Sequence, residues 1–101
     1  MKIVIHHGGN SSLAGTQATF HDGVITLGRR PGNTITFDPH RDGIVSGHHA
    51  EIRVTANRVT IRDLGSANKT FVDGQMLGSE ERELRSGNMI VLGTDGPMLK
   101  L

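Results

Sequence analysis

The stretch from Ala50 to Arg62 alternates apolar and polar side chains on both sides of a short break at Ala56-Asn57. Successive side chains of a β-strand point to opposite faces, so an alternation with period two buries one face and wets the other. A two-residue break is a common length for a hairpin connection. The stretch therefore predicts an antiparallel hairpin whose apolar face must pack against another layer, and this requirement constrains the whole fold.

Short apolar runs separated by turn residues continue this pattern along the rest of the chain. Asp22-Gly23 and Asp73-Gly74 are strong hairpin signals, so we expect each to join the two strands beside it into a hairpin. About ten or eleven short strands and no convincing helix predict an all-β fold, a twisted antiparallel β-sandwich of two sheets. Besides the hairpin, strands are expected at 2–6, 16–20, 24–27, 34–37, 70–72, 75–77, around 84, at 89–92 and at 98–101.

Length and composition agree with a single domain that occupies residues 1–101. The last strand, 98–101, is apolar, which suggests either one module of a longer protein or the plain end of a short chain. The sequence has no cysteine, which excludes disulfides, thiolate metal sites and cysteine nucleophiles and fits a cytoplasmic protein. The apolar run at Met1–Ile5 is too short for a signal peptide or a membrane span.

The charge balance argues against nucleic acid as a partner. Lys and Arg number 11 and Asp and Glu number 10, so the formal net charge is only +1. Binding along a nucleic-acid backbone needs clustered basic side chains, and stacking on bases needs aromatic rings. Trp and Tyr are absent and Phe occurs three times. Any anion site must therefore be local.

Polar residues suited to such a local site follow or precede several strands. Gly28-Arg29 follows the run 24–27, and Ser46-Gly47 precedes the central hairpin. Arg can give forked hydrogen bonds to phosphate, and a hydroxyl beside an unhindered backbone N–H forms a small anion nest. Asn68 carries an amide that can pair with a peptide backbone. Taken singly, each has a purely structural explanation: Arg29 as a solvated side chain, Ser46-Gly47 as an ordinary turn and Asn68 as an Asx turn. The order and spacing of all three together is therefore the stronger signal.

In that order and spacing, these residues resemble the forkhead-associated (FHA) domain, a module that reads phosphothreonine. The family pattern is Gly-Arg, Ser-x-x-His, Ser-x-Asn-Gly-Thr, an Asn/Asp-Gly hairpin, a Leu, a Gly and a final Leu-Gly. The match runs from Val24 to Gly93. Its parts here are Gly28-Arg29, Ser46 with His49, Ser66-Ala67-Asn68-Lys69-Thr70, Asp73-Gly74, Leu84, Gly87 and Leu92-Gly93.

The resemblance implies an FHA/SMAD-like sandwich with the ligand loops at one end. Arg29 and Ser46 would hold the phosphate of a phosphothreonine, with the backbone N–H of Gly47 beside them. Asn68 would hydrogen-bond the peptide backbone, and Lys69 would add a cation near the phosphate. The implied function is recognition of phosphothreonine-containing proteins or peptides that a Ser/Thr kinase has marked, with no cofactor, no metal and no catalysis.

The resemblance also gives Gly28 and His49 architectural roles, because they would shape and brace the loops. Three departures weaken the match in detail. Gly47 stands where the family often has Arg or Asn, Lys69 replaces a Gly, and Ala67 lacks a hydroxyl or amide. If position 69 needs a positive φ, Lys costs roughly 1 kcal/mol there. The segment 42–45, which contains Ile44, would choose the third residue after the phosphothreonine, with an apolar preference.

An esterase is one alternative, with Ser46 as nucleophile, His48 or His49 as base and Asp63 as the orienting group. The nucleophile elbow of such enzymes needs Gly two residues before and two residues after the Ser. Ile44 and His48 occupy those places, and an all-β sandwich lacks the strand-to-helix turn that exposes the Ser.

A metal site is a second alternative, drawn from His48, His49 and Glu51 or from His6-His7. Neighbouring residues on a strand point to opposite faces, so His48 and His49 cannot chelate one ion without a bend. No HExxH or similar ligand spacing occurs.

The third alternative is a different function on the same sandwich fold. A sandwich of this kind could bind protein without phosphate, or associate with itself through a sheet face or edge, and Gly47 and Lys69 keep this option open. Removing the charge of Arg29 distinguishes the two functions, because a phosphate reader must lose affinity and a face or edge binder need not.

Overall fold

The computed structural model describes residues 1–101 as eleven strands in two sheets, without a helix. No segment therefore forms a helix capable of crossing a bilayer. One sheet has the order β2-β1-β11-β10-β7-β8, and the other has the order β4-β3-β5-β6-β9. The strands are β1 Ile3–Gly9, β2 Gln17–Phe20, β3 Gly23–Gly28, β4 Ile35–Thr36, β5 Ala50–Val54, β6 Val59–Asp63, β7 Thr70–Val72, β8 Gln75–Met76, β9 Arg82–Leu84, β10 Met89–Leu92 and β11 Pro97–Lys100.

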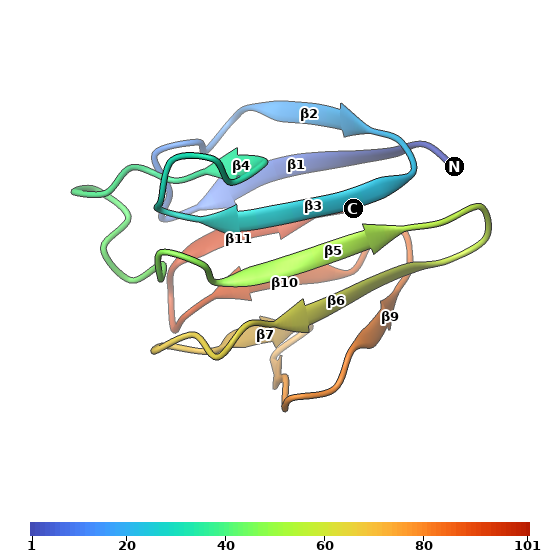
Figure 1. Cartoon of the computed structure of the whole chain (residues 1–101). Coiled ribbons are helices and arrows are strands. Elements are labelled where there is room, and N and C mark those ends of the chain that lie inside the picture. The colour runs from blue at the N-terminus through green and yellow to red at the C-terminus, as the bar shows by residue number, and fades with distance from the viewer.

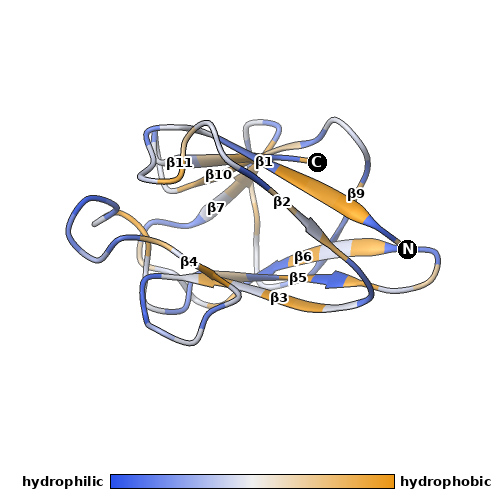
Figure 2. Cartoon of the chain, turned by 90° about the horizontal axis from the view of Figure 1, so that it is seen from above, coloured by the Kyte–Doolittle hydropathy of each residue, from blue (hydrophilic) through white to orange (hydrophobic).

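The two sheets form the two layers of a sandwich, and the core lies between them (Figure 2). Inward-facing side chains of both sheets are fully buried, among them Ile52 and Ile61 of one sheet and Ile90 and Leu99 of the other. The central hairpin has the expected register, with Ile52 opposite Ile61. The prediction of an all-β sandwich is confirmed.

The two Asp-Gly signals had different outcomes. Asp73-Gly74 joins β7 to β8 in a hairpin, and both residues have a positive φ, as a tight primed turn requires. The hairpin predicted at Asp22-Gly23 is wrong, because β2 pairs with β1 whereas β3 pairs with β4 and β5 in the other sheet. The segment crosses between the layers there. Asp22 accepts a hydrogen bond of 2.5 Å from the N-terminal amine instead of closing a turn.

A second difference lies at β4, which is only two residues long and runs parallel to β3. After β3 the chain loops back until Thr34 lies beside Thr26, where each backbone N–H donates to the other residue's hydroxyl, at 2.8 and 3.0 Å. From there it runs forward again along Leu27 and Gly28. This return delivers residues 38–49 to the end of the sandwich where β3 stops.

The loops that follow β3, β4, β6 and β10 gather at one end of the molecule, on the left in Figure 1, and the N-terminus lies at the opposite end. Gly28 is a point of very close backbone approach at this end. A Cβ on Gly28 would lie 2.1 Å from the carbonyl oxygen of Gly47 and 2.7 Å from Asn33 Nδ2.

Gly28→Ala should therefore force the two segments apart and lower the free energy of unfolding by roughly 2 kcal/mol or more. Urea denaturation followed by circular dichroism measures this change. Gly78→Ala is the matched control, because a Cβ there meets nothing within 4 Å. Equal stability of the two variants would show that the close approach at Gly28 is not needed.

Candidate functional site

The turn after β3 and the loop before β5 are held side by side by their backbones. The N–H of Arg29 donates to Ser46 O at 3.0 Å, and the N–H of Arg30 donates to Gly47 O at 3.2 Å. The buried amide of Asn33 donates to Arg30 O at 2.8 Å and to Gly47 O at 2.9 Å. Arg29 and Ser46 are therefore brought together by a fixed backbone framework.

His49 is fully buried and joins this framework to the loop after β6. Its Nδ1 accepts the N–H of Ser46 at 3.0 Å, which leaves Nε2 as the protonated nitrogen that donates to Lys69 O at 2.8 Å. Burial lowers the pKa of His49, although the Lys69 carbonyl and the charge of Asp63 oppose this shift. A neutral imidazole therefore sets the distance between the two loops.

Asp63 organises the loop after β6 from within. Its carboxylate accepts hydrogen bonds from the N–H and hydroxyl of Ser66, from the Thr70 hydroxyl and from the N–H of Gly65. Burial raises the pKa of Asp63, but the hydrogen bonds from Ser66 and Thr70 outweigh it, so the pKa lies below its usual value. The carboxylate is thus ionised, and its hydrogen bonds are all made within its own loop.

The remaining predicted site residues lie on the rim of the same end. The hydroxyl of Ser46 accepts the N–H of Ala67 at 3.0 Å, and Asn68 Nδ2 donates to Ile44 O at 2.9 Å. Asn68 and Lys69 are exposed. Lys69 has a φ of 70°, so the backbone here has the left-handed conformation that the family's Gly adopts easily. The loop keeps its path and tolerates the strain.

The guanidinium of Arg29 is half-buried and already braced by the loop before β5. Its Nε donates to Val45 O, and its Nη1 donates to Pro39 O at 3.1 Å. A guanidinium has five N–H bonds, so three remain for a ligand. The brace fixes where those three point.

Sequence reasoning did not single out Arg30, whose side chain lies across Gly47. A Cβ on Gly47 would meet Arg30 Nε at 2.9 Å and Arg30 Cγ at 3.0 Å. The guanidinium of Arg30 makes no hydrogen bond or ion pair within the protein, and neither does the backbone N–H of Gly47. Gly-Arg-Arg in the sequence gives two neighbouring cations, but only the fold shows that the second one reaches the position beside Ser46.

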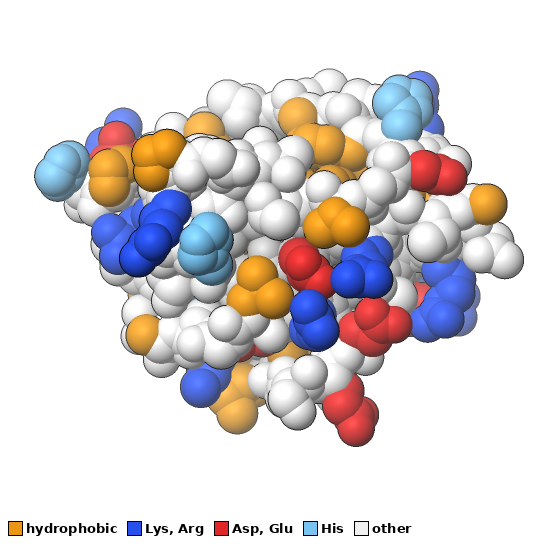
Figure 3. Space-filling view, viewed as in Figure 1, with side chains coloured by type: hydrophobic (Ala, Val, Ile, Leu, Met, Phe, Trp, Pro, Cys, Tyr) orange, Lys and Arg blue, Asp and Glu red, His pale blue; other side chains and the backbone are white.

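Asp42 and Asp38 support the loops of this end through their carboxylates, a role that sequence reasoning missed. Asp42 is 2% exposed and accepts hydrogen bonds from the N–H and hydroxyl of Ser12 and from the N–H of Asp38. Asp38 accepts the N–H groups of His40 and Arg41, which lower its pKa. Both carboxylates are therefore hydrogen-bonded within the loops themselves. Lys, Arg and His side chains, in contrast, gather on the outside of this end, at the left of Figure 3.

The esterase geometry does not form. Both ring nitrogens of His49 are engaged by backbone groups, and neither contacts the hydroxyl of Ser46. Asp63 is directed at Ser66 and Thr70 and hydrogen-bonds neither His48 nor His49. The site therefore offers donors and cations at one rim, without an activated nucleophile.

Comparison of the sequence and the fold with known proteins identifies the family. The family model of the FHA domain matches residues 25–93. The chain belongs to the FHA-domain family. The glycogen accumulation regulator GarA of Mycobacterium tuberculosis is 31% identical to this FHA domain over 91 residues, which cover 90% of the domain and 51% of GarA. The chain thus spans about half the length of this relative.

Two solved structures resemble this FHA domain over nearly its full length. The FHA domain of a hypothetical protein from Arabidopsis thaliana has a TM-score of 0.83 and 25% identity, covering 96% of this chain and 80% of that one. EmbR of Mycobacterium tuberculosis, in complex with a low-affinity phosphopeptide, has a TM-score of 0.76 and 26% identity, covering 96% of this chain and 24% of EmbR.

The neutral His49 makes the stability of this FHA domain depend on pH. Its pKa in the folded state lies below the unfolded value of about 6.5, as does that of the buried His7, which burial also lowers. The stabilisation is complete above that value and is lost as the pH falls through the folded pKa. The free energy of unfolding, measured by urea denaturation, should therefore fall between about pH 7 and pH 5.

His49→Ala should lower stability at neutral pH and flatten this pH dependence, because it removes the proton acceptor and leaves two backbone groups without their partner. Each unpaired buried group costs about 1–3 kcal/mol. His48→Ala changes the exposed neighbour and should behave as the parent does. A parent whose stability is flat over this pH range would contradict the neutral state of His49.

Proposed function

We propose that this FHA domain binds phosphothreonine-containing segments of other proteins through the rim formed by its loops. The observation that carries the proposal is the convergence of unpaired donors on one spot. Three N–H bonds of Arg29, the hydroxyl proton of Ser46, the N–H of Gly47 and the guanidinium of Arg30 all lie there, and the nearby carboxylates are engaged by the loops themselves. A phosphate dianion supplies the acceptors that this arrangement lacks.

Arg30 offsets the main departure of this chain from the family pattern. Gly47 brings no side chain to the phosphate, but the small size of Gly47 is what lets Arg30 lie across it. The cation therefore comes from the neighbouring turn. Lys69, exposed at the end of the next loop and free of ion pairs, adds a second mobile cation to the same rim.

Asn68 is suited to hold the peptide backbone next to the phosphothreonine. One of its amide N–H bonds goes to Ile44 O, which fixes the side chain and leaves its carbonyl oxygen and second N–H for a ligand. The complex of EmbR with a phosphopeptide supports peptide binding by a domain of this shape.

Ile44 is the residue proposed to select the third residue after the phosphothreonine. It is half-buried, and its side chain packs on Gly93 and Gly96, where added Cβ atoms would lie 2.5 and 2.9 Å from it. This surface is apolar, so an aliphatic peptide side chain would bury area against it.

The wider function follows the same proposal. The domain acts by recognition and without catalysis, its partner is a protein marked by a Ser/Thr kinase, and the cytoplasm, where such kinases act, is its site of action. The relationship to GarA, a regulator by name, supports a role in regulation.

The proposal is tested by titrating the domain with degenerate phosphothreonine, phosphoserine and unphosphorylated peptide pools. We expect binding to the phosphothreonine pool alone. Arg29→Ala should weaken it at least about tenfold, because a charge-assisted hydrogen bond contributes about 1.5–3 kcal/mol, and Ser46→Ala should weaken it less. Arg53→Ala, an exposed Arg on β5, is the control. Equal binding to all three pools, or binding to none of them, would contradict the proposal.

The role of Arg30 is tested separately by its dependence on Gly47. Arg30→Ala should weaken phosphothreonine binding by roughly fivefold to tenfold. In a Gly47→Asn background, where the new side chain displaces Arg30, the same substitution should have little further effect. Isothermal titration of the four variants with one phosphopeptide gives this coupling. Parent-like affinity of Arg30→Ala would remove Arg30 from the site and leave the function in place.

A further inference from the structure

The turn between β10 and β11, residues 93–96, is built into the same end of the molecule as the ligand loops. The N–H of Gly93 donates at 2.8 Å to Lys69 O, the carbonyl oxygen that also accepts the buried imidazole. Gly93 and Gly96 are buried against Ile44, and Cβ atoms on them would lie 2.5 and 2.9 Å from its side chain. The turn is therefore fixed against the loop before β5 and the loop after β6.

Asp95 lies at the exposed tip of this turn, and its carboxylate is free. Its φ is 59°, a conformation that Asp tolerates better than most residues. The side chain forms no hydrogen bond and no ion pair within the protein. The other carboxylates of this end, those of Asp38, Asp42 and Asp63, are hydrogen-bonded within the loops. Asp95 is therefore the anion of the ligand end that is available to a partner.

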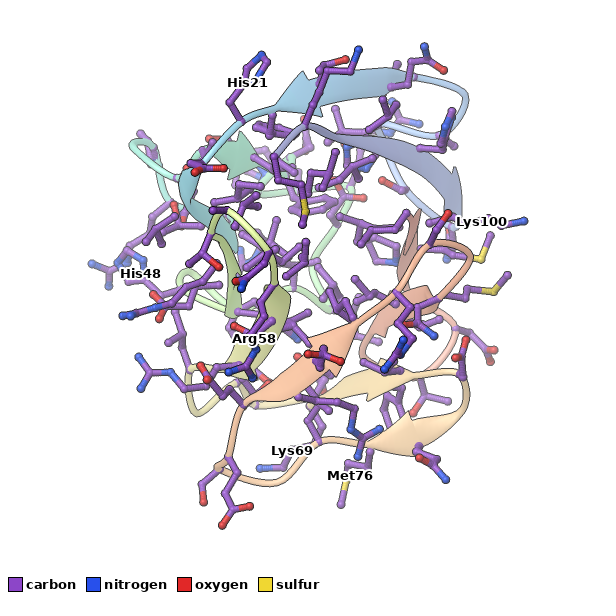
Figure 4. All side chains as sticks on the ribbon, turned by 90° about the vertical axis from the view of Figure 1, so that its right-hand side faces the viewer. His21, His48, Arg58, Lys69, Met76 and Lys100 are labelled. Atoms are coloured by element: carbon purple, nitrogen blue, oxygen red, sulfur yellow. The ribbon has the colours of Figure 1, made fainter.

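The segments around the turn do not neutralise Asp95. The loop 9–16, which lies against the turn at Gly96, contains no charged residue. Lys69 and Lys100 belong to the segments on either side of the turn, but neither forms an ion pair with Asp95. Figure 4 shows the side chains of these two lysines pointing to opposite sides of the molecule. The carboxylate of Asp95 therefore presents its charge to solvent.

The charged and apolar groups of the ligand end follow one order. Arg29 donates to Val45 O, Ile44 is the adjacent residue, and Asp95 is on the turn that packs against Ile44. From the expected phosphate site toward this turn, a cation is thus followed by an apolar side chain and then by an anion. A peptide that carries a phosphate, then an aliphatic side chain and then a cation has the complementary order.

We propose that Asp95 selects a basic residue of the partner, one or two positions after the residue that packs on Ile44. This inference rests on the proposed function, which places the phosphothreonine at Arg29 and the third following residue at Ile44. Each further residue of an extended peptide advances about 3.3 Å, and the side chains of Lys and Arg are long and flexible. The ligand is therefore a phosphothreonine segment with an aliphatic residue at the third following position and Lys or Arg at the fourth or fifth.

Three phosphothreonine peptides with Ile at the third following position test this selection. They carry Arg, Gln or Glu at both the fourth and the fifth position and are otherwise identical. An exposed ion pair changes affinity by a factor of roughly 1.5 to 5. The parent should bind the Arg peptide roughly threefold more tightly than the Gln peptide, and the Glu peptide more weakly than both. Isothermal titration at low ionic strength, where exposed charges are least screened, measures these affinities.

Asp95→Asn tests the role of the carboxylate, because Asn has the same shape and also tolerates the left-handed backbone. This variant should bind the Gln peptide as the parent does and should lose the preference for the Arg peptide. Glu80→Gln is the matched control, since it removes the same charge from an exposed side chain in the loop between β8 and β9. It should keep the parent's preference, and thermal unfolding shows whether both variants are folded.

Equal affinity of the parent for the three peptides overturns the selection by Asp95. So does a preference that survives Asp95→Asn, or one that Glu80→Gln removes equally. The unphosphorylated Gln peptide separates this result from the proposed function. If the parent requires the phosphate but shows no preference among the three peptides, only the role of Asp95 is wrong. If the phosphate makes no difference to binding, the proposed function is wrong, and the selection that rests on it is overturned as well.

Discussion

The binding end of the molecule depends on the buried imidazole of His49. Its two nitrogens hold the N–H of Ser46 and the carbonyl of Lys69, which belong to different loops and lie 23 residues apart along the chain. An imidazole can perform both tasks only while it is neutral, and burial favours that state. Ser46 is expected to bind the phosphate, and the loop that contains Asn68 and Lys69 is expected to bind the peptide. The distance between them is thus set by one rigid imidazole ring within the protein.

Around that ring, the polar groups are sorted by charge. The carboxylates of Asp38, Asp42 and Asp63 point at backbone N–H groups and hydroxyls of their own loops, and they hold those loops in shape. The cations have few internal partners and point outward. A nearly neutral chain can in this way present a locally positive rim, because what matters for an anion is which charges are free and not the total.

Local patterns in the sequence predicted local structure well. The alternation from Ala50 to Arg62 was enough for the central hairpin, and Asp73-Gly74 was enough for the next one, because both pairings are between chain neighbours. The same signal failed at Asp22-Gly23, where the strands on either side find better partners in different sheets. Strand pairing over a distance is decided by tertiary packing, which a dipeptide does not encode.

The site residues named by the family pattern are brought together by the fold, but Arg30 and Asp42 were not foreseen because their contacts join segments far apart in sequence. The contact of Arg30 with Gly47 has a consequence for the history of such domains. A larger residue at position 47 fits only if the side chain at position 30 moves away or shrinks. Across related domains the two positions should therefore covary, with bulk appearing at one as it disappears from the other.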